Sequence, residues 1–297
     1  MPHILPLAES ASHIHKSYTI ADIIPIMKIK KVIKLGESDD ARLVGGKAHA
    51  LSDLIKAGFT VPEGFVVTTI AFHKITPELE TEILYEFDRL DSEFVAVRSS
   101  AVAEDSIEAA WAGQLDTYLN VTKDKLLASI RKCQDSAKSD RAKAYARGKS
   151  LDSGEVGVVI QKMVQGEVSG VAFSAHPITG DKGQTIIEAG FGLGEAVVSG
   201  QITPDSYIFD KTSQEILEKH VSRQTKQLIK SRHGGDIWQD LSKEGESQKL
   251  SDGQIKELGN LVSRIEKYFG FPVDVEWTVS DGKLYILQSR PITTLSQ

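Results

Sequence analysis

Two cationic side chains stand in positions that suit the binding of an anion. Lys47 follows Gly45 and Gly46 at the predicted start of a helix, where unpaired backbone N–H groups and the positive helix end favour an anion. Arg98 ends an apolar β run and precedes two serines, so a rigid fork of donors lies beside hydroxyl groups that could share phosphate oxygens. The Gly-Gly-Lys sequence lacks the spacing of a P-loop. A solvated helix lysine and a strand-end salt bridge explain the same residues, so the local patterns leave both interpretations open.

The C-terminal segment predicts a β-hairpin with one polar face. Residues 273–279 alternate apolar and polar side chains, so one face would pack on a core while the other displays carboxylates, including Glu276. On the return strand, Gln288 and Arg290 share a face. A carboxylate, an amide and a guanidinium are therefore expected on one hairpin.

The Asp281-Gly282 turn leaves the register of this hairpin open. A two-residue loop would place Glu276 and Gln288 on opposite sides of the sheet, whereas a three-residue loop with Gly282 in the left-handed conformation would place them on the same side. If the two side chains meet, their oxygens would suit Mg²⁺, which keeps several waters and takes further ligands from phosphate. The alternative is an exposed polar face on a terminal hairpin.

Two glycine-rich segments could approach a ligand closely. Residues 111–114, WAGQ, predict either a mobile loop over a ligand or a simple turn before a strand. Residues 188–200, EAGFGLGEAVVSG, follow a strand and open a helix. They do not match the dinucleotide-binding pattern GxGxxG, because Glu195 occupies the position where a small residue lets the helix and strand pack closely.

The elements that must position these residues alternate between helices and short strands after Lys31, which predicts an α+β or α/β fold. Residues 45–58 predict one helix, and a capping box at Ser251 and Gln254 begins another that ends at Gly270. The other expected elements are a helix at about 123–146, strands at 94–101, 114–121, 156–164, 169–175 and 184–190, a hairpin at 206–217 and a surface loop at about 231–249.

Composition describes an ordinary globular chain. The 297 residues are 40% hydrophobic and 26% charged, enough for one large domain or two lobes with their own cores. A net charge of -6 gives no general attraction to nucleic acid or to an anionic membrane. The single cysteine, Cys133, excludes an internal disulfide or a multi-cysteine metal site and favours a reducing cytoplasm. No apolar run approaches the length that spans a bilayer.

Six separate blocks resemble the nucleotide-binding domain of the phosphoenolpyruvate synthase and pyruvate phosphate dikinase family. They occur in the family's order between about Leu35 and Thr294. The blocks read VGGKAHALSDLIKAGFTVPEGFVVTT, FVAVRSSAVAEDS, WAGQLDTYLNV, VVIQKMVQGEVSGVAFSAHPITGD, IIEAGFGLGEAVVSGQITPDSYIFD and VEWTVSDGKLYILQSRPIT. Chance agreement of all six is negligible.

The resemblance implies an α+β, two-lobed ATP-grasp-like fold that clamps ATP between its lobes. Residues 1–30 would be an N-terminal extension, because they make a poor signal peptide and precede the matching blocks. Residues 31–164 would form the N-terminal lobe, ending in a hinge that contacts adenine. Residues 165–297 would form the C-terminal lobe with the metal-binding hairpin.

The same resemblance implies which residues contact the phosphates of ATP. Lys47, Arg98 and Arg290 would hold the phosphates, with Arg290 on the phosphate being moved, and all three would act in the transfer. Gly113 and Thr117 would belong to the loop over them. Such roles suit phosphoryl transfer, which depends mainly on positioning and on neutralising negative charge.

The adenine and metal contacts are implied in the same way. The strand from Gln161 through Met163 to Val164 would border the adenine. Glu276 and Gln288 would be ligands of Mg²⁺. Two further residues of the matching blocks, His176 and Glu188, would have supporting or structural roles.

The sequence departs from the family after the nucleotide-binding domain. In the family, phosphate passes to a histidine on a swivelling domain and then to pyruvate bound by a barrel domain. This sequence stops at Gln297, and none of its eight histidines lies in a glycine-rich, HAAI-like segment. The expected partners are therefore ATP, a histidine domain or subunit in trans, and pyruvate only through a partner domain, with no nucleic acid and no membrane.

Two other functions remain open from the sequence. Rifamycin phosphotransferases resemble this domain almost as well, and none of the matching blocks contacts the final acceptor. A non-catalytic nucleotide-binding remnant is the second alternative, although all the expected charged groups are present.

Overall fold

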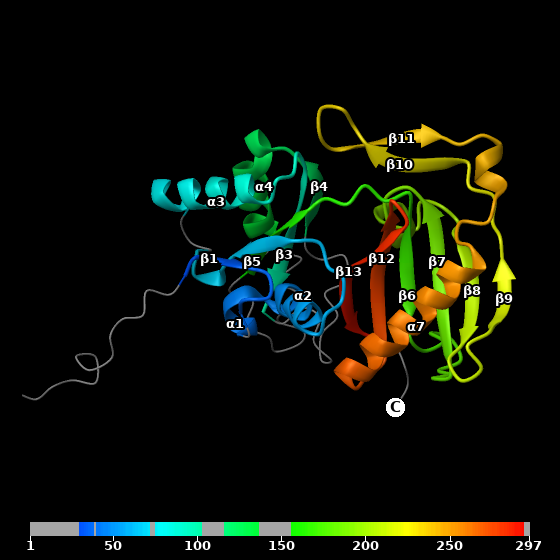
Figure 1. The fold of residues 1–297 in the computed structure, drawn as a ribbon. Helices are drawn as coiled ribbons and strands as arrows, with labels where there is room; N and C mark the ends of the chain where they lie inside the picture. The colour runs from blue at the N-terminus through cyan, green and yellow to red at the C-terminus, as the bar shows by residue number, and fades with distance from the viewer. Residues whose placement is uncertain (1–29, 39, 72–74, 103–115, 137–155, 294–297) are drawn as a thin grey trace, which may run out of the picture. The chain divides into compact units, whose positions relative to one another are not determined.

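The computed structural model describes residues 30–38, 40–71, 75–102, 116–136 and 156–293. It contains helices and antiparallel sheets (Figure 1), so the α+β class is confirmed. Two large sheets, each with its own helices, agree with the two-lobed ATP-grasp-like fold that the resemblance implied. The predicted extension, residues 1–30, lies almost wholly outside the described residues.

The first sheet has five antiparallel strands in the order β1-β2-β5-β3-β4. Strand alternation directs side chains to its two faces: Val158 and Ile160 of β5 pack with α3 and α4, whereas Val159 packs with α1 and α2. The elements are β1 (Val32–Lys34), α1 (Ala41–Val44), α2 (Gly46–Lys56), β2 (Gly64–Val67), a 3-10 turn η2 (Thr69–Ala71), α3 (Pro77–Arg89), β3 (Val95–Ala101), β4 (Thr117–Val121), α4 (Lys123–Ser136) and β5 (Val156–Lys162).

The second sheet has six antiparallel strands in the order β13-β12-β6-β7-β8-β9. The helix α7 lies across it (Figure 1) and buries Ile255, Leu258, Val262 and Ile265 in the core beside Trp277. The predicted capping box of α7 and its left-handed Gly270 cap are both observed. The elements are β6 (Val168–Phe173), β7 (Gln184–Phe191), α6 (Glu195–Val198), β8 (Asp205–Asp210), β9 (Ile216–His220), α7 (Asp252–Phe269), β12 (Val273–Ser280) and β13 (Lys283–Pro291).

The predicted surface loop at about 231–249 is wrong in part. A separate two-stranded hairpin forms from β10 (Lys226–Lys230) and β11 (Asp236–Asp240), followed by the 3-10 turn η3 (Lys243–Glu246). All five β11 residues are exposed, so no apolar alternation marks the strand. The Lys226 ammonium covers the Trp238 ring at 4.1 Å from its centroid. Backbone pairing with β10 supplies the remaining stabilisation of the strand.

The β10–β11 hairpin also reaches the edge of the first sheet. The buried Asn120 of β4 donates from Nδ2 to Asp236 Oδ1 at 2.6 Å, and its Oδ1 accepts from Gln165 Nε2 at 2.6 Å. Its carbonyl oxygen accepts from Gly235 N at 2.9 Å. Residues before and after the predicted 164/165 boundary are thus bonded to one another. Lys31–Gln297 form one compact unit, so division into two domains stays a prediction.

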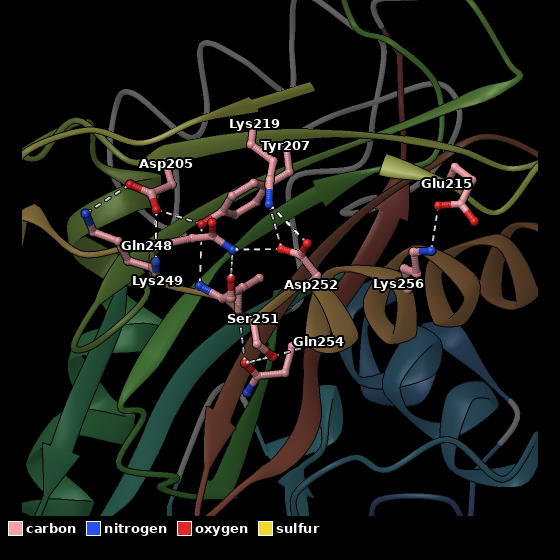
Figure 2. A network of polar contacts seen from close by, with 11 residues as sticks. Asp205, Tyr207, Glu215, Lys219, Gln248, Lys249, Ser251, Asp252, Gln254 and Lys256 are labelled. Carbon is pink, nitrogen blue, oxygen red and sulfur yellow. Dashed lines mark hydrogen bonds and ion pairs between the residues drawn. The ribbon is translucent and has the colours of Figure 1, made fainter. Parts of the chain in front are cut away.

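A buried ion pair anchors the segment that leads into α7 (Figure 2). The side chains of Asp205 and Lys249 are fully buried, and Lys249 Nζ lies 2.9 Å from Asp205 Oδ1. Asp205 also accepts from Ser222 N, Lys249 N and the Tyr207 hydroxyl, at 2.9, 2.9 and 2.6 Å. Burial, together with the Asp205 carboxylate, raises the pKa of Tyr207, so this hydroxyl remains a donor. The charges are therefore paired and hydrogen-bonded, as burial requires.

None of the helices among the described residues combines the length and apolar character needed to cross a bilayer.

Candidate functional site

A cavity of about 630 Å³ is lined by side chains from both large sheets. All the sequence-predicted site residues that the structure describes line it: Lys47, Arg98, Thr117, Gln161, Met163, Val164, Glu276, Gln288 and Arg290. Gly113 lies outside the described residues. The cavity brings together segments far apart in the sequence, while the role of each residue stays a prediction.

Lys47 reaches the cavity because α2 begins against the end of β3. Gly45 has φ +82°, and a Cβ atom there would lie 2.0 Å from the Ser100 carbonyl oxygen. The Ser100 hydroxyl accepts from Ala48 N at 3.1 Å, which satisfies one backbone donor of the first helical turn. Lys47 is 5% exposed and donates to the Ser99 carbonyl oxygen at 3.0 Å. The ammonium group is therefore held against β3 and does not extend into solvent.

Gly45→Ala should destabilise the chain by about 2–4 kcal/mol, because it combines left-handed strain with a backbone collision. Gly58→Ala is the matched control, since Gly58 has φ +80° with no atom within 4 Å of the added Cβ; it should cost about 1–2 kcal/mol. Urea unfolding of both variants measures the difference. Equal losses would show that the contact with Ser100 is unimportant.

Arg98 extends from β3 to the C-terminal hairpin. Its Nη1 donates to the Leu287 carbonyl oxygen at 2.7 Å, and its Nη2 donates to Gln288 Oε1 at 2.5 Å and to Glu276 Oε2 at 3.0 Å. The residue is 7% exposed. One guanidinium therefore joins strand β3 of the first sheet to three acceptors on the second.

The hairpin places Glu276 and Gln288 on one face through a combination of loop and register that neither of the two loop-length alternatives included. Ser280 pairs with Lys283, so Asp281 and Gly282 form a two-residue loop, with φ of 50° and 70° as in a type I′ turn. That loop alone would separate the two side chains. However, Trp277 pairs with Ile286 while Glu276 pairs with Gln288.

Leu287 is therefore the extra residue of a β-bulge, which shifts the register by one. The shift returns Gln288 to the face of Glu276 and also pairs Asp274 with Arg290. It takes Leu287 out of the pairing register, and the carbonyl oxygen of this residue is the one that accepts from Arg98.

Asp274 and Arg290 form a partly buried ion pair beside these groups. Arg290 Nε and Nη2 lie 2.9 and 2.8 Å from Asp274 Oδ2. Asp274 Oδ1 is buried and has no hydrogen-bond partner among the described residues. Burial raises the pKa of Asp274, although Arg290 opposes the shift, and burial together with Asp274 raises the pKa of Glu188.

Sequence reasoning placed Asp274 on a polar face without giving it a role. Because Asp274 lies two residues before Glu276, it could have been identified from the sequence as a further residue of the site. Its pairing with Arg290, however, depends on the bulge at Leu287.

The predicted adenine end of the cavity is more apolar. Met163 packs beside a small cluster that contains Leu193, Ala196 and Leu228, with Leu119 also against it. Gln161 is buried and donates from Nε2 to the Pro62 carbonyl oxygen at 3.2 Å. This arrangement offers an apolar surface for a planar ring next to a strand end.

Glu195 is a cavity residue that sequence reasoning used only to reject a dinucleotide site. It is the first residue of α6 and lines the cavity. Its pKa is raised by burial first, then by Glu276 and Asp236, while Arg98 lowers it. The glycine-rich run before Glu195 was the only signal for it in the sequence.

His176, which was expected to have a supporting or structural role, lies in an exposed turn. Its Nδ1 accepts hydrogen bonds from Ile178 N and Thr179 N at 3.2 and 3.3 Å.

The donor set fits Mg²⁺ better than a softer metal. Glu276 and Gln288 present hard oxygen atoms, and the unpartnered Oδ1 of Asp274 is a further acceptor nearby on the same face. Across the described residues, no three His, Cys, Asp or Glu side chains gather in a metal-binding group. A magnesium ion here would therefore need oxygen atoms from water and phosphate as well as from protein.

The model of the family described as "Pyruvate phosphate dikinase, AMP/ATP-binding domain" matches residues 74–297. The "Probable phosphoenolpyruvate synthase" of Archaeoglobus fulgidus is 36% identical over 309 residues, which cover 87% of this chain and 41% of the relative. The "Rifampicin phosphotransferase" of Bacillus subtilis is 36% identical over 307 residues, covering 87% of this chain and 35% of the relative. The chain thus spans less than half the length of these curated relatives.

Among solved structures, the D-alanine–D-alanine ligase from Bacillus anthracis complexed with ATP resembles this chain with a TM-score of 0.40 and 11% sequence identity. The similarity covers 87% of this chain and 58% of the ligase chain.

Proposed function

Because the chain belongs to the family of pyruvate phosphate dikinase AMP/ATP-binding domains, we propose that its cavity binds Mg-ATP and presents a phosphoryl group to a histidine on another domain or subunit. The observation that carries this proposal is the meeting of Lys47, Arg98 and Arg290 with the oxygen atoms of Glu276 and Gln288 around one cavity. In a chain of net charge -6, such a local cluster of cations favours a polyanion.

Each cationic residue would act on a different part of the triphosphate. Lys47, held against Ser99, would provide a fixed positive charge at the start of α2. Arg98 and Arg290 would provide planar forks of donors for phosphate oxygens, and Thr117 at the start of β4 would lie under the predicted loop. Gln161, Met163 and Val164 would border the adenine. None of these contacts requires a covalent step by the chain, because positioning and charge neutralisation suffice.

Glu276 and Gln288 would hold the Mg²⁺ ion, which neutralises phosphate charge when it is bound. The bulge at Leu287 keeps their side chains on one face. In the transfer, a histidine nitrogen of the acceptor would form a bond to the β-phosphorus of ATP while the bond from that phosphorus to the oxygen kept by AMP breaks, and water would then cleave the outer phosphate to leave phosphohistidine. Arg290 would stabilise the charge that develops on the moving group.

For the complete system we propose phosphoenolpyruvate synthesis, in which ATP, pyruvate and water give AMP, phosphoenolpyruvate and phosphate. The acceptor histidine and the pyruvate site would lie outside residues 1–297, and we place the system in the cytoplasm. The similarity to the "Probable phosphoenolpyruvate synthase" over 87% of the chain supports pyruvate as the final acceptor.

Calorimetry and a transfer assay test the proposal together. Titration of Mg-ATP into the chain should release or absorb heat with one site per chain. Addition of a histidine domain from a phosphoenolpyruvate synthase should then give acid-labile phosphohistidine, AMP and phosphate. Heat without phosphohistidine would reject the transfer step, and no heat at all would reject the nucleotide site.

Antibiotic phosphorylation is a second candidate, favoured by the 36% identity with a rifampicin phosphotransferase. The chain would then perform the same first step, and only the final acceptor would differ. Supplying histidine and acceptor domains from each class, with pyruvate or rifampicin as the acceptor, separates the two. The productive combination identifies the acceptor.

A further inference from the structure

The guanidinium of Arg98 bonds the same oxygen atoms that are proposed to hold the metal. Its Nη2 lies 2.5 Å from Gln288 Oε1 and 3.0 Å from Glu276 Oε2, while Nη1 lies 2.7 Å from the Leu287 carbonyl oxygen. The bulge residue and the Glu276–Gln288 pair next to it are therefore joined to one positive group. The geometry points to a further role for Arg98: it holds the metal ligands in place and competes with a divalent cation for them. This inference rests on the proposed magnesium site.

Electrostatics makes simultaneous occupancy unfavourable. A magnesium ion sits about 2.0–2.1 Å from its oxygen ligands, so on these oxygens it would lie within a few ångströms of the guanidinium. Arg98 is 7% exposed, and water screens such a buried repulsion poorly. A metal that arrives alone must therefore displace Arg98 from Glu276 and Gln288 or bind weakly.

A bound triphosphate changes this balance, because it supplies new acceptors for the displaced group. The planar fork of arginine pairs with phosphate oxygens in two parallel hydrogen bonds. Arg98 could then turn from the hairpin to the phosphates while the metal takes Glu276 and Gln288. Metal and nucleotide affinities would be coupled through this residue, and the coupling is reciprocal.

The other cations of the cavity provide the comparison that isolates this effect. Lys47 donates to the Ser99 carbonyl oxygen, and Arg290 pairs with Asp274. Removing Lys47 takes one positive charge from the cavity without removing the hydrogen bonds that Arg98 makes to Glu276 and Gln288. Lys47→Met is therefore a matched control for the loss of charge alone.

Binding of Mn²⁺ alone to the full chain, without nucleotide, tests the inference. The free ion is measured by electron paramagnetic resonance. Arg98→Met should bind Mn²⁺ about tenfold more tightly than the unmodified chain, because a nearby positive charge has been removed. Lys47→Met should gain much less, and Arg98→Met/Glu276→Gln should lose the gain. A purely structural role for Arg98 predicts weaker binding, since the ligands would no longer be held together.

The outcomes separate this inference from the proposed function. Suppose that Arg98→Met binds Mn²⁺ no more tightly than the unmodified chain, whereas Glu276→Gln alone binds it more weakly. The proposed competition is then overturned, and the metal site stands. If Glu276→Gln changes nothing, with or without a non-hydrolysable ATP analogue, the proposed metal site itself fails. Should Arg98→Met fail to fold by circular dichroism, Arg98→Lys replaces it: a smaller gain supports the competition, and no gain contradicts it.

Discussion

Arg290→Ala is expected to lower the rate of phosphohistidine formation by about 10²–10³-fold, while Mg-ATP affinity falls by about tenfold or less. The reason is that a donor aimed at developing charge matters more in the transition state than in the bound ground state. Arg290 pairs with Asp274 at the end of the cavity that carries Glu276 and Gln288. Rapid-quench measurement of phosphohistidine, with calorimetry of Mg-ATP binding, separates the two effects.

Arg264→Ala serves as the matched control for loss of an arginine. Arg264 lies on α7, with its guanidinium 5.2 Å from the centroid of the Phe59 ring, and it does not line the cavity. Its replacement should change neither rate nor affinity by more than about twofold, as expected of a surface substitution. If Arg290→Ala lowered affinity and rate equally, Arg290 would be only a binding contact, and a non-catalytic nucleotide-binding protein would become the better interpretation.

Asp205→Asn is expected to lower the free energy of unfolding by about 3–5 kcal/mol, because it leaves the buried ammonium of Lys249 without its charge partner. The substitution also places an amide where both carboxylate oxygens accept hydrogen bonds, including those from Ser222 N and the Tyr207 hydroxyl. Urea unfolding followed by tryptophan fluorescence measures the loss. Figure 2 shows the network beside the start of α7. The substitution therefore removes stabilising contacts from the second sheet, to which Asp205 belongs.

The exposed ion pair in the same view is the matched control. Lys219 Nζ lies 2.8 Å from Asp252 Oδ1, but the two side chains are 38% and 61% exposed. Asp252→Asn should therefore cost less than about 1 kcal/mol. A loss of similar size in both variants would mean that burial does not determine the contribution of the Asp205–Lys249 pair.

The sequence by itself determined the elements whose signals are local. The alternation of residues 273–279 identified a strand with one buried face, and the capping box at Ser251 with Gly270 identified the two ends of α7. These predictions succeeded because side-chain period and cap chemistry depend on neighbours a few residues away. The phosphate, adenine and metal contacts that the family resemblance implied all line one cavity wherever the structure describes them, although no local pattern could have joined them.

Only the tertiary structure decided the register of the hairpin and the groups that meet there. The bulge at Leu287 carries no mark in the sequence, because any residue can be inserted where the partner strand and neighbouring packing accept it. The contact of Arg98 with Glu276 depends on two sheets closing on each other, and the paired state of β11 depends on β10, since an exposed strand shows no apolar alternation. Such features follow from long-range pairing and burial, which the order of residues along a short segment does not encode.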